Sequence, residues 1–145
     1  MATDLGPLFP NNFTGIPTHM STGDFNIWGR WHAFNWQHFS GFYFDAAVGV
    51  GTIPPPGGPE KLRAAWIRLT KKRIDAIGLR ADAIWIIEVR ATAGSSALGA
   101  VLTYLHLLRD DNPFSLPLAG AIITDRADDD SRRVMAAYNI TAIEV

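Results

Sequence analysis

RIDAIGLRADAIWIIEVR, residues 73–90, holds two apolar runs separated by a short polar turn. The runs Arg73–Leu79 and Ile84–Val89 are rich in isoleucine, which favours strands. The turn between them, Arg80–Ala83, is short enough for a hairpin. The stretch therefore predicts two antiparallel strands at the centre of the fold.

The residues after this hairpin predict two helices and two strands. A serine pair at 95–96 can cap a helix that runs to about Arg109 and buries a stripe of leucine and valine side chains. The continuous apolar run Leu118–Thr124 is typical of a central strand. Aspartates at 128–130 favour the start of a helix that ends at Asn139, before a last strand at Thr141–Val145.

The residues before the hairpin begin with an irregular arm. Residues 1–23 are rich in Pro, Gly, Asn and Thr and show neither helical nor strand periodicity. Such an arm buries little of itself, so we expect a neighbouring subunit to hold it, with packing on its own domain as the alternative. A helix from Asp24, its cap, to about Phe39, a strand at Phe42–Val48 and a helix at Glu60–Lys71 are expected to follow.

This order of elements predicts one α/β domain, residues 24–145, with a mixed central sheet flanked by helices. A chain of 145 residues, 48% of them hydrophobic, is the size of one domain and has ample apolar surface for a core. Without cysteine it cannot form disulfides or zinc–thiolate sites. The N-terminus lacks the pattern of a signal peptide, and the longest uncharged stretch, Ala91–Leu108, is periodic, so no membrane partner is expected.

Two acidic residues on the central strands are the best candidates for chemistry. Asp75 and Glu88 are expected to project from one face near the edge of the sheet, and Arg90 shares the face of Glu88 by the strand period of two. Two neighbouring carboxylates can bind Mg²⁺, which activates water and stabilises a phosphoryl transition state. The alternative is an ion pair of Asp75 with Arg73 or Arg90, with no chemistry.

This arrangement resembles the PD-(D/E)XK nuclease superfamily. That family has a restriction-endonuclease-like αβββαβ core, which carries an Asp, a gap of about a hairpin and then Glu-x-Lys. The resemblance covers residues 24–124, with the helix at 60–71 as an insertion. It implies Asp75 and Glu88 as the metal ligands, with Asp75, Glu88 and Arg90 as the catalytic residues. In an active nuclease, Asp45 or Glu60 would supply an additional acid.

Two departures from the family pattern indicate that the fold is retained without its chemistry. The position of the family's lysine is held by Arg90, whose guanidinium does not lose its proton and has a different geometry. The first helix, residues 24–39, has no counterpart of the family's glutamate. The motif is therefore degenerate, and we expect no catalytic residue, no bound metal and no cofactor.

A second resemblance covers nearly the whole chain. Several segments look like those of a set of small tailed-phage proteins that are similar in length and associated with the head-to-tail region: the Trp28/Trp31 segment, YFD at 43–45 before VGVG at 48–51, LTKKRID at 69–75, EVR at 88–90 and ALG at 97–99. The resemblance implies a virion protein of the phage neck, such as a connector or tail-terminator ring. Such a protein is assembled in the host cytoplasm as a homo-oligomer and contacts neighbouring neck or tail proteins.

The distribution of aromatic and charged residues agrees with such an assembly. Nine of the aromatic residues fall within 25–44, and Trp28, Trp31 and Trp36 are expected at a partner interface. Positive charge gathers between 60 and 73, where it could contact a partner or the phosphates of DNA that passes through a ring: Lys61, Arg63, Arg68, Lys71, Lys72 and Arg73. The near-neutral net charge of −1 argues against a dedicated nucleic-acid coat.

The sequence therefore favours a non-catalytic structural virion protein at the head–tail neck of a tailed phage. The alternative is a Mg²⁺-dependent DNA nuclease of the PD-(D/E)XK type. A small DNA-binding protein without catalysis is a third possibility, through the basic run.

Overall fold

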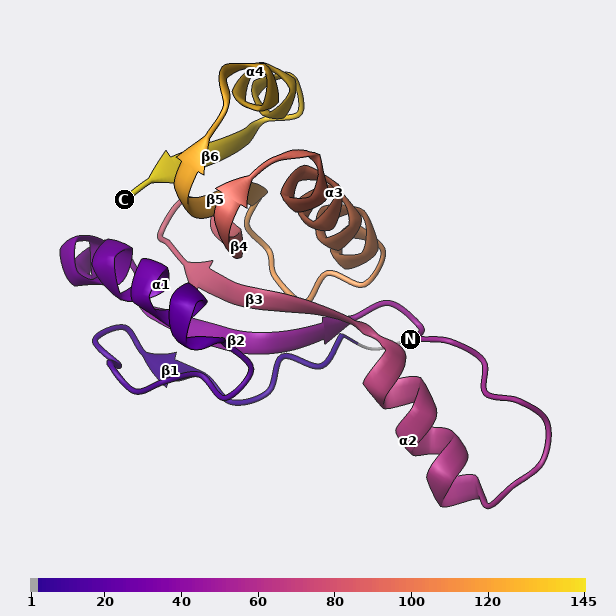
Figure 1. The fold of residues 1–145 in the computed structure, drawn as a ribbon. Coiled ribbons are helices and arrows are strands. Elements are labelled where there is room, and N and C mark those ends of the chain that lie inside the picture. Colours follow the sequence, from indigo (N-terminus) through magenta and orange to yellow (C-terminus); the bar gives the residue numbers. More distant parts are fainter. Residues whose placement is uncertain (1–2) are drawn as a thin grey trace.

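The computed structural model describes residues 3–145 as one six-stranded sheet with helices on both faces (Figure 1). The strands lie in the order β1-β2-β3-β4-β5-β6. Neighbours from β1 to β4 are antiparallel, whereas β4, β5 and β6 are parallel. The elements are β1 (Phe9–Pro10), α1 (Thr22–Asn35), a 3-10 turn (Trp36–His38), β2 (Gly41–Val48), α2 (Glu60–Thr70), β3 (Lys72–Leu79), β4 (Ile84–Ala93), α3 (Ser95–Asp110), β5 (Leu118–Ala127), α4 (Asp129–Ala137) and β6 (Ile140–Glu144). The predicted α/β class and mixed sheet are confirmed.

The helix ends differ slightly from those predicted. Ser21, not Asp24, is the N-cap of α1, since its hydroxyl accepts a hydrogen bond from the backbone amide of Asp24 at 3.1 Å. The α3 helix has Gly94 at its N-cap, so the serine pair at 95–96 lies in the first turn. These are shifts of a few residues at boundaries, where capping choices compete closely.

Two apolar clusters hold the layers together, one on each face of the sheet. The α1 helix packs Trp28 and Trp31 against the sheet around Phe42, Ile87 and Ile123. On the opposite face, α3 and α4 cover a cluster that includes the sheet residues Ile74, Ile86 and Ile122. Because alternate residues of a strand point to opposite faces, the apolar runs of β3, β4 and β5 supply both clusters.

The arm packs on its own domain, so the expected neighbouring subunit is not needed to order it. Asp4 and Ala47 exchange two backbone hydrogen bonds of 2.9 and 2.8 Å, and Phe9 pairs with Phe42 of β2. The arm thereby satisfies backbone groups along the edge of β2, which would otherwise be left without a partner. Met1 and Ala2, the first residues of the predicted arm, lie outside the described residues.

Two of the three tryptophans predicted at a partner interface are in the core, and that prediction is wrong for them. Trp28 and Trp31 are only 2% and 3% exposed, and their rings pack edge-on against Phe42. Burial in the chain's own core removes their large apolar surfaces from water, so none is left for a partner. Trp36 is partly buried, and its place at an interface stays a prediction.

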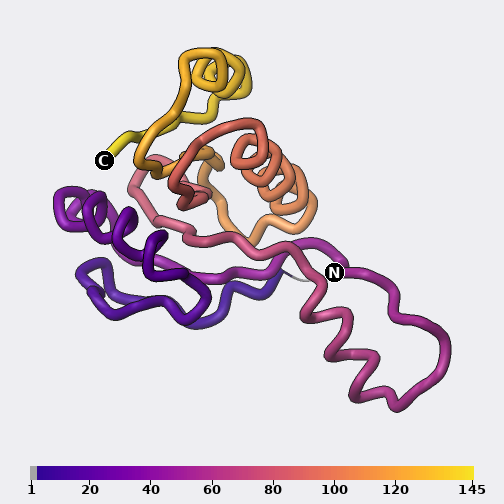
Figure 2. Tube along the Cα trace, viewed as in Figure 1, coloured from indigo at the N-terminus to yellow at the C-terminus, as the bar shows by residue number. Residues whose placement is uncertain are grey.

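The α2 helix stands apart from the rest of the domain. In Figures 1 and 2 it extends away from the sheet, with its C-terminal end continuing into β3 and a long loop returning to its N-terminal end. None of its residues is buried. No helix among residues 3–145 is long and apolar enough to cross a membrane.

Candidate functional site

The site predicted around Asp75 lies where β3 separates from β4. The β3–β4 pairing runs from Leu79 opposite Ile84 to Ala76 opposite Ile87 and then stops. Just beyond it, the Asp75 side chain replaces a backbone partner: its Oδ2 accepts a hydrogen bond of 2.9 Å from the amide of Val89. The Asp75 carboxylate thus gives the Val89 amide a hydrogen-bond acceptor at the point where the β3–β4 pairing ends.

The neighbouring position on β2 is also irregular. Asp45 lies between the pairs Phe44–Ala76 and Ala46–Ile74, directly across from Asp75 in the register, and has a positive φ of 55°. Residues other than glycine seldom adopt this left-handed conformation. Two aspartates therefore interrupt adjacent strands at the same level of the sheet.

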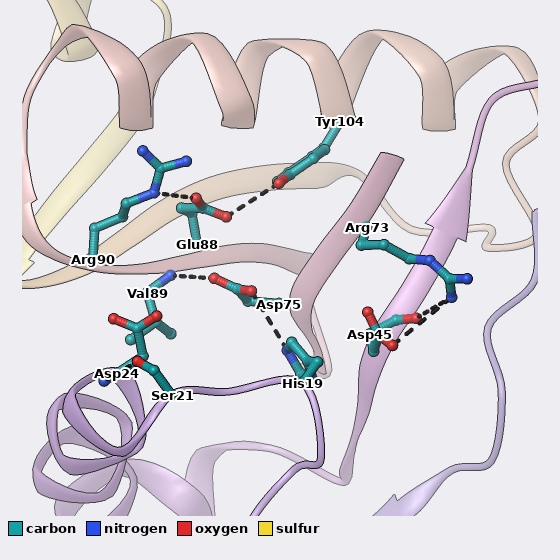
Figure 3. A network of polar contacts seen from close by, with 10 residues as sticks. All are labelled: His19, Ser21, Asp24, Asp45, Arg73, Asp75, Glu88, Val89, Arg90 and Tyr104. Atoms are coloured by element: carbon teal, nitrogen blue, oxygen red, sulfur yellow. Dashed lines mark hydrogen bonds and ion pairs between the residues drawn. The ribbon is translucent and has the colours of Figure 1, made fainter. Parts of the chain in front are cut away.

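Glu88 forms a closed polar cluster on the α3 side of the sheet (Figure 3). Its side chain is only 4% exposed, and its Oε2 lies 2.6 Å from Nε of Arg90. Its Oε1 accepts a hydrogen bond of 3.2 Å from the Tyr104 hydroxyl, which comes from α3. Arg90 in turn donates from Nη1 to the Ser96 hydroxyl at 2.7 Å. Both oxygens of the carboxylate therefore have partners within the chain.

The surroundings of this cluster raise the pKa of two of its side chains, Glu88 and Tyr104. Burial, followed by the negative charge of Asp75, raises the pKa of Glu88 to about 7, although Arg90 acts in the opposite direction. Burial and the charge of Glu88 likewise raise the pKa of Tyr104 above its ordinary value, so its hydroxyl remains a hydrogen-bond donor. Glu88 thus changes its charge near neutral pH.

His19, from the arm, completes the cluster on the other side of Asp75 (Figure 3). Its Nε2 lies 3.4 Å from Oδ1 of Asp75, close enough for an ion pair when the imidazole is protonated. Burial lowers the pKa of His19, but the hydrogen-bonding and charge effects of Asp75, with the charge of Asp45, outweigh it and raise the pKa. His19 could not be predicted as part of the site, because nothing in its spacing links an arm residue to β3.

A cavity of about 380 Å³ lies between the arm and the sheet, with His19 in its wall. Asp45 and Arg73 line it as well, and their side chains approach to 3.8 Å. Much of the remaining wall comes from the arm, including the rings of Phe9 and Phe13. The cavity is mostly apolar, with its charged groups supplied by β2, β3 and the arm.

The structure brings the predicted residues Asp75, Glu88 and Arg90 together, but not in the alternative ion pairs considered from the sequence. Arg73 pairs with Asp45, Arg90 pairs with Glu88, and the partner of Asp75 is His19. Glu88 is a buried residue and not an exposed charge at the sheet edge.

The remaining predicted residues lie apart from this centre. Glu60 is exposed at the N-terminal end of α2, the end that points away from the sheet, so it does not supply an additional acid. The basic residues 61–72 lie on α2, at its C-cap Lys71 and at the start of β3. Among them, Arg63 donates hydrogen bonds to the carbonyls of Pro55 and Gly57 and so tethers α2 to its preceding loop.

The donor set does not fit a Mg²⁺ site as arranged. Magnesium requires several oxygen ligands with free lone pairs in an octahedral geometry. Glu88 directs its oxygens to Arg90 and Tyr104, and one oxygen of Asp75 accepts from Val89. Within residues 3–145 no group of three or more acidic or histidine side chains is placed to hold a metal ion. The arrangement is that of an internal ion pair supported by hydrogen bonds.

Comparison with protein-family models, with curated proteins and with solved structures finds no match to this chain.

Proposed function

We propose that this chain is a non-catalytic structural virion protein of a tailed phage, located at the head–tail neck as part of a connector or tail-terminator ring. The non-catalytic assignment rests on one observation: the Glu88 side chain is buried and paired within its own chain. Its side chain is 4% exposed, and both of its carboxylate oxygens contact groups of the same chain. A carboxylate whose lone pairs are occupied by a guanidinium and a hydroxyl is poorly placed to bind metal or substrate.

The topology supports a degenerate restriction-endonuclease-like fold. The elements α1, β2, β3, β4, α3 and β5 follow the αβββαβ order of that fold, with α2 inserted between the first two strands. The first three of these strands are antiparallel, and the crossover through α3 makes β5 parallel to β4. In this proposal Asp75, Glu88 and Arg90 correspond to the family motif, with arginine in place of lysine.

The neck location rests on the likeness of the sequence segments to small tailed-phage proteins and is supported by features suited to assembly. The arm is fixed along the sheet edge, which blocks uncontrolled strand pairing there. The α2 helix carries exposed apolar residues that the domain itself does not cover. Exposed apolar residues gathered on one element are typical of protein interfaces.

The test of this proposal is the presence of the protein in purified particles of the phage that encodes it. Particles are banded in a density gradient, and the protein is quantified against the major capsid protein. We expect several copies in each particle, retained after a high-salt wash. Its absence from particles that infect normally would refute the neck assignment.

One observation favours the second candidate, a Mg²⁺-dependent DNA nuclease. The negative charge of Asp75 lies close enough to Glu88 to help raise the pKa of Glu88, as a neighbouring metal ligand would. A conformational change that withdrew Arg90 from Glu88 would leave a pair of acidic side chains at one point of the sheet.

The nuclease candidate is tested by incubating duplex and single-stranded DNA with the purified protein and Mg²⁺ or Mn²⁺. We expect no cleavage above the background given by Glu88→Gln, prepared in parallel. Cleavage that needs the metal and disappears in Glu88→Gln, while Glu144→Gln retains it, would establish the nuclease and refute the non-catalytic assignment.

A further inference from the structure

The α2 helix presents an apolar stripe to the surroundings. Leu62, Trp66 and Leu69 are 66%, 44% and 72% exposed. Their spacing of four and three residues places them on one side of the helix. Exposure of this apolar stripe to water is unfavourable, and the domain already has two filled apolar clusters. The free energy of the system falls when another apolar surface covers the stripe.

The same end of the molecule carries a concentrated positive charge. Between residues 60 and 73 there are six cations and one acid, Glu60, which gives a net charge of +5. The whole chain has a net charge of −1, so the remaining residues together carry −6. Apart from this segment, a second copy of this chain therefore carries a net negative charge, which favours its approach to α2.

A matching apolar groove lies at the other end of the domain, between α1 and β6. It has a volume of about 470 Å³, and its apolar wall includes Phe34, Trp85 and Ile143. Phe34 is 82% exposed although it is a large aromatic residue. Arg30 and Glu144 also line it, and each is ion-paired within the chain, Arg30 with Asp125 and Glu144 with Arg132. In Figures 1 and 2, α2 extends from one end of the sheet, whereas α1 and β6 lie at the opposite end.

We propose that the apolar stripe of α2 docks in the α1–β6 groove of a second copy of this chain. The two surfaces differ and lie at opposite ends, so the contact is head-to-tail and can repeat from copy to copy. Such a repeat closes into a ring when the rotation between copies allows it. The inference rests on the proposed function and extends it, since this contact would be the interface between neighbouring subunits of the proposed ring.

A nucleic acid is the less suitable occupant. Phosphates would pair with the cations of α2 but would leave Leu62 and Leu69 in water. The apolar stripe is explained only by a partner that has apolar surface of its own. DNA binding by α2 would therefore contradict the proposal.

The experiment measures the mass of the protein in solution by light scattering over a range of concentrations. The wild-type chain is expected to form assemblies that are multiples of its 15.9 kDa. Trp66→Glu, on the stripe, and Phe34→Glu, in the groove, are each expected to reduce the mass to that of one chain. Val134→Glu is the matched control, because it changes an exposed apolar helix residue (46% exposed) outside both surfaces and should leave the assembly intact.

Mixing the two monomeric variants tests the head-to-tail geometry. The Trp66→Glu chain keeps its groove and the Phe34→Glu chain keeps its helix, so one contact can form but cannot repeat. We expect a 1:1 dimer, twice 15.9 kDa, in the mixture and in neither variant alone. Circular dichroism and urea unfolding establish that both variants are folded, as expected for changes at exposed positions.

Three results would overturn the inference: a wild-type chain that is monomeric at every concentration, variants that assemble like the wild type, or a mixture that stays monomeric. A monomeric wild type that binds duplex DNA, and loses that binding when Lys61 and Arg68 are neutralised, would identify α2 as a nucleic-acid element instead. Failure of the neck proposal is separate. An assembly broken by Trp66→Glu, in a protein that is absent from phage particles, would leave this inference standing and refute the location.

Discussion

Replacement of Glu88 by glutamine should remove much of the pH dependence of stability near neutral pH. The native state raises the pKa of this carboxyl from 4.5 to about 7, so the folded protein binds its proton more tightly than the unfolded chain does. The resulting stabilisation is complete below pH 4.5 and is lost as pH rises through about 7. One pKa unit corresponds to about 1.4 kcal/mol, so the wild type should lose roughly 3 kcal/mol of unfolding free energy across this window.

His19 acts in the same direction but at higher pH. Its native pKa is raised above 6.5, so its stabilisation is complete below that value and is lost as pH rises further. The loss between pH 5 and 6.5 therefore belongs mainly to Glu88. Glu144, whose pKa is lowered by the amide of Ala127 and by Arg132, contributes stability that is lost only as pH falls below its ordinary value of 4.5.

The assay is urea unfolding of wild type, Glu88→Gln and the control Glu144→Gln at half-unit intervals from pH 5 to 8. Wild type and Glu144→Gln should lose stability with the same slope as pH rises. Glu88→Gln should show a much smaller loss below pH 6.5, because its amide does not titrate. An equal slope in all three proteins, or a wild type that gains stability between pH 5 and 6.5, would refute the assignment of a buried, proton-binding carboxyl.

Three further substitutions test hydrogen bonding and packing within the domain. Tyr104→Phe removes the hydroxyl that donates to Glu88, and it should lower the unfolding free energy by about 1–2 kcal/mol in urea titrations. Gly78→Ala places a methyl group 2.7 Å from the ring of Phe39, so it should lower the melting temperature, with a cost of about 1–3 kcal/mol. Gly99→Ala lies within α3 with open space around it, and should instead stabilise by about 0.5–1 kcal/mol. A stabilising Gly78→Ala, or a neutral Tyr104→Phe, would contradict the structure.

Most of the architecture was accessible from the sequence because it depends on local patterns. The apolar runs of β3, β4 and β5 and the turn at residues 80–83 are strong strand and hairpin signals, and all three strands begin within one residue of the predicted position. The β4 strand, predicted to end at Val89, continues to Ala93. The β5 strand extends to Ala127 because Thr92 and Ala93 of β4 continue to pair with it. Pairing partners, which local patterns do not reveal, set the ends of strands.

The arm and the geometry of the site could not be predicted, because both depend on contacts between residues far apart in the sequence. The two-residue strand β1 includes Pro10 and has no alternation, so only the backbone groups of β2 identify it as a strand. The left-handed conformation of Asp45 and the approach of His19 to Asp75 likewise arise from tertiary structure. The density of aromatic residues at 25–44 is equally compatible with a core and with an interface. The structure buries Trp28 in the core.

The central claim is that the Glu88 carboxylate serves an internal ion pair and not a metal ion. The most direct measurement is a titration of the protein with Mn²⁺, followed by the electron paramagnetic resonance signal of the free ion, for wild type and Glu88→Gln at pH 8. We expect weak, non-saturating binding that is the same for both proteins, since Arg90 and Tyr104 occupy the carboxylate oxygens. Saturable binding of one ion to each wild-type chain, lost in Glu88→Gln, would contradict it.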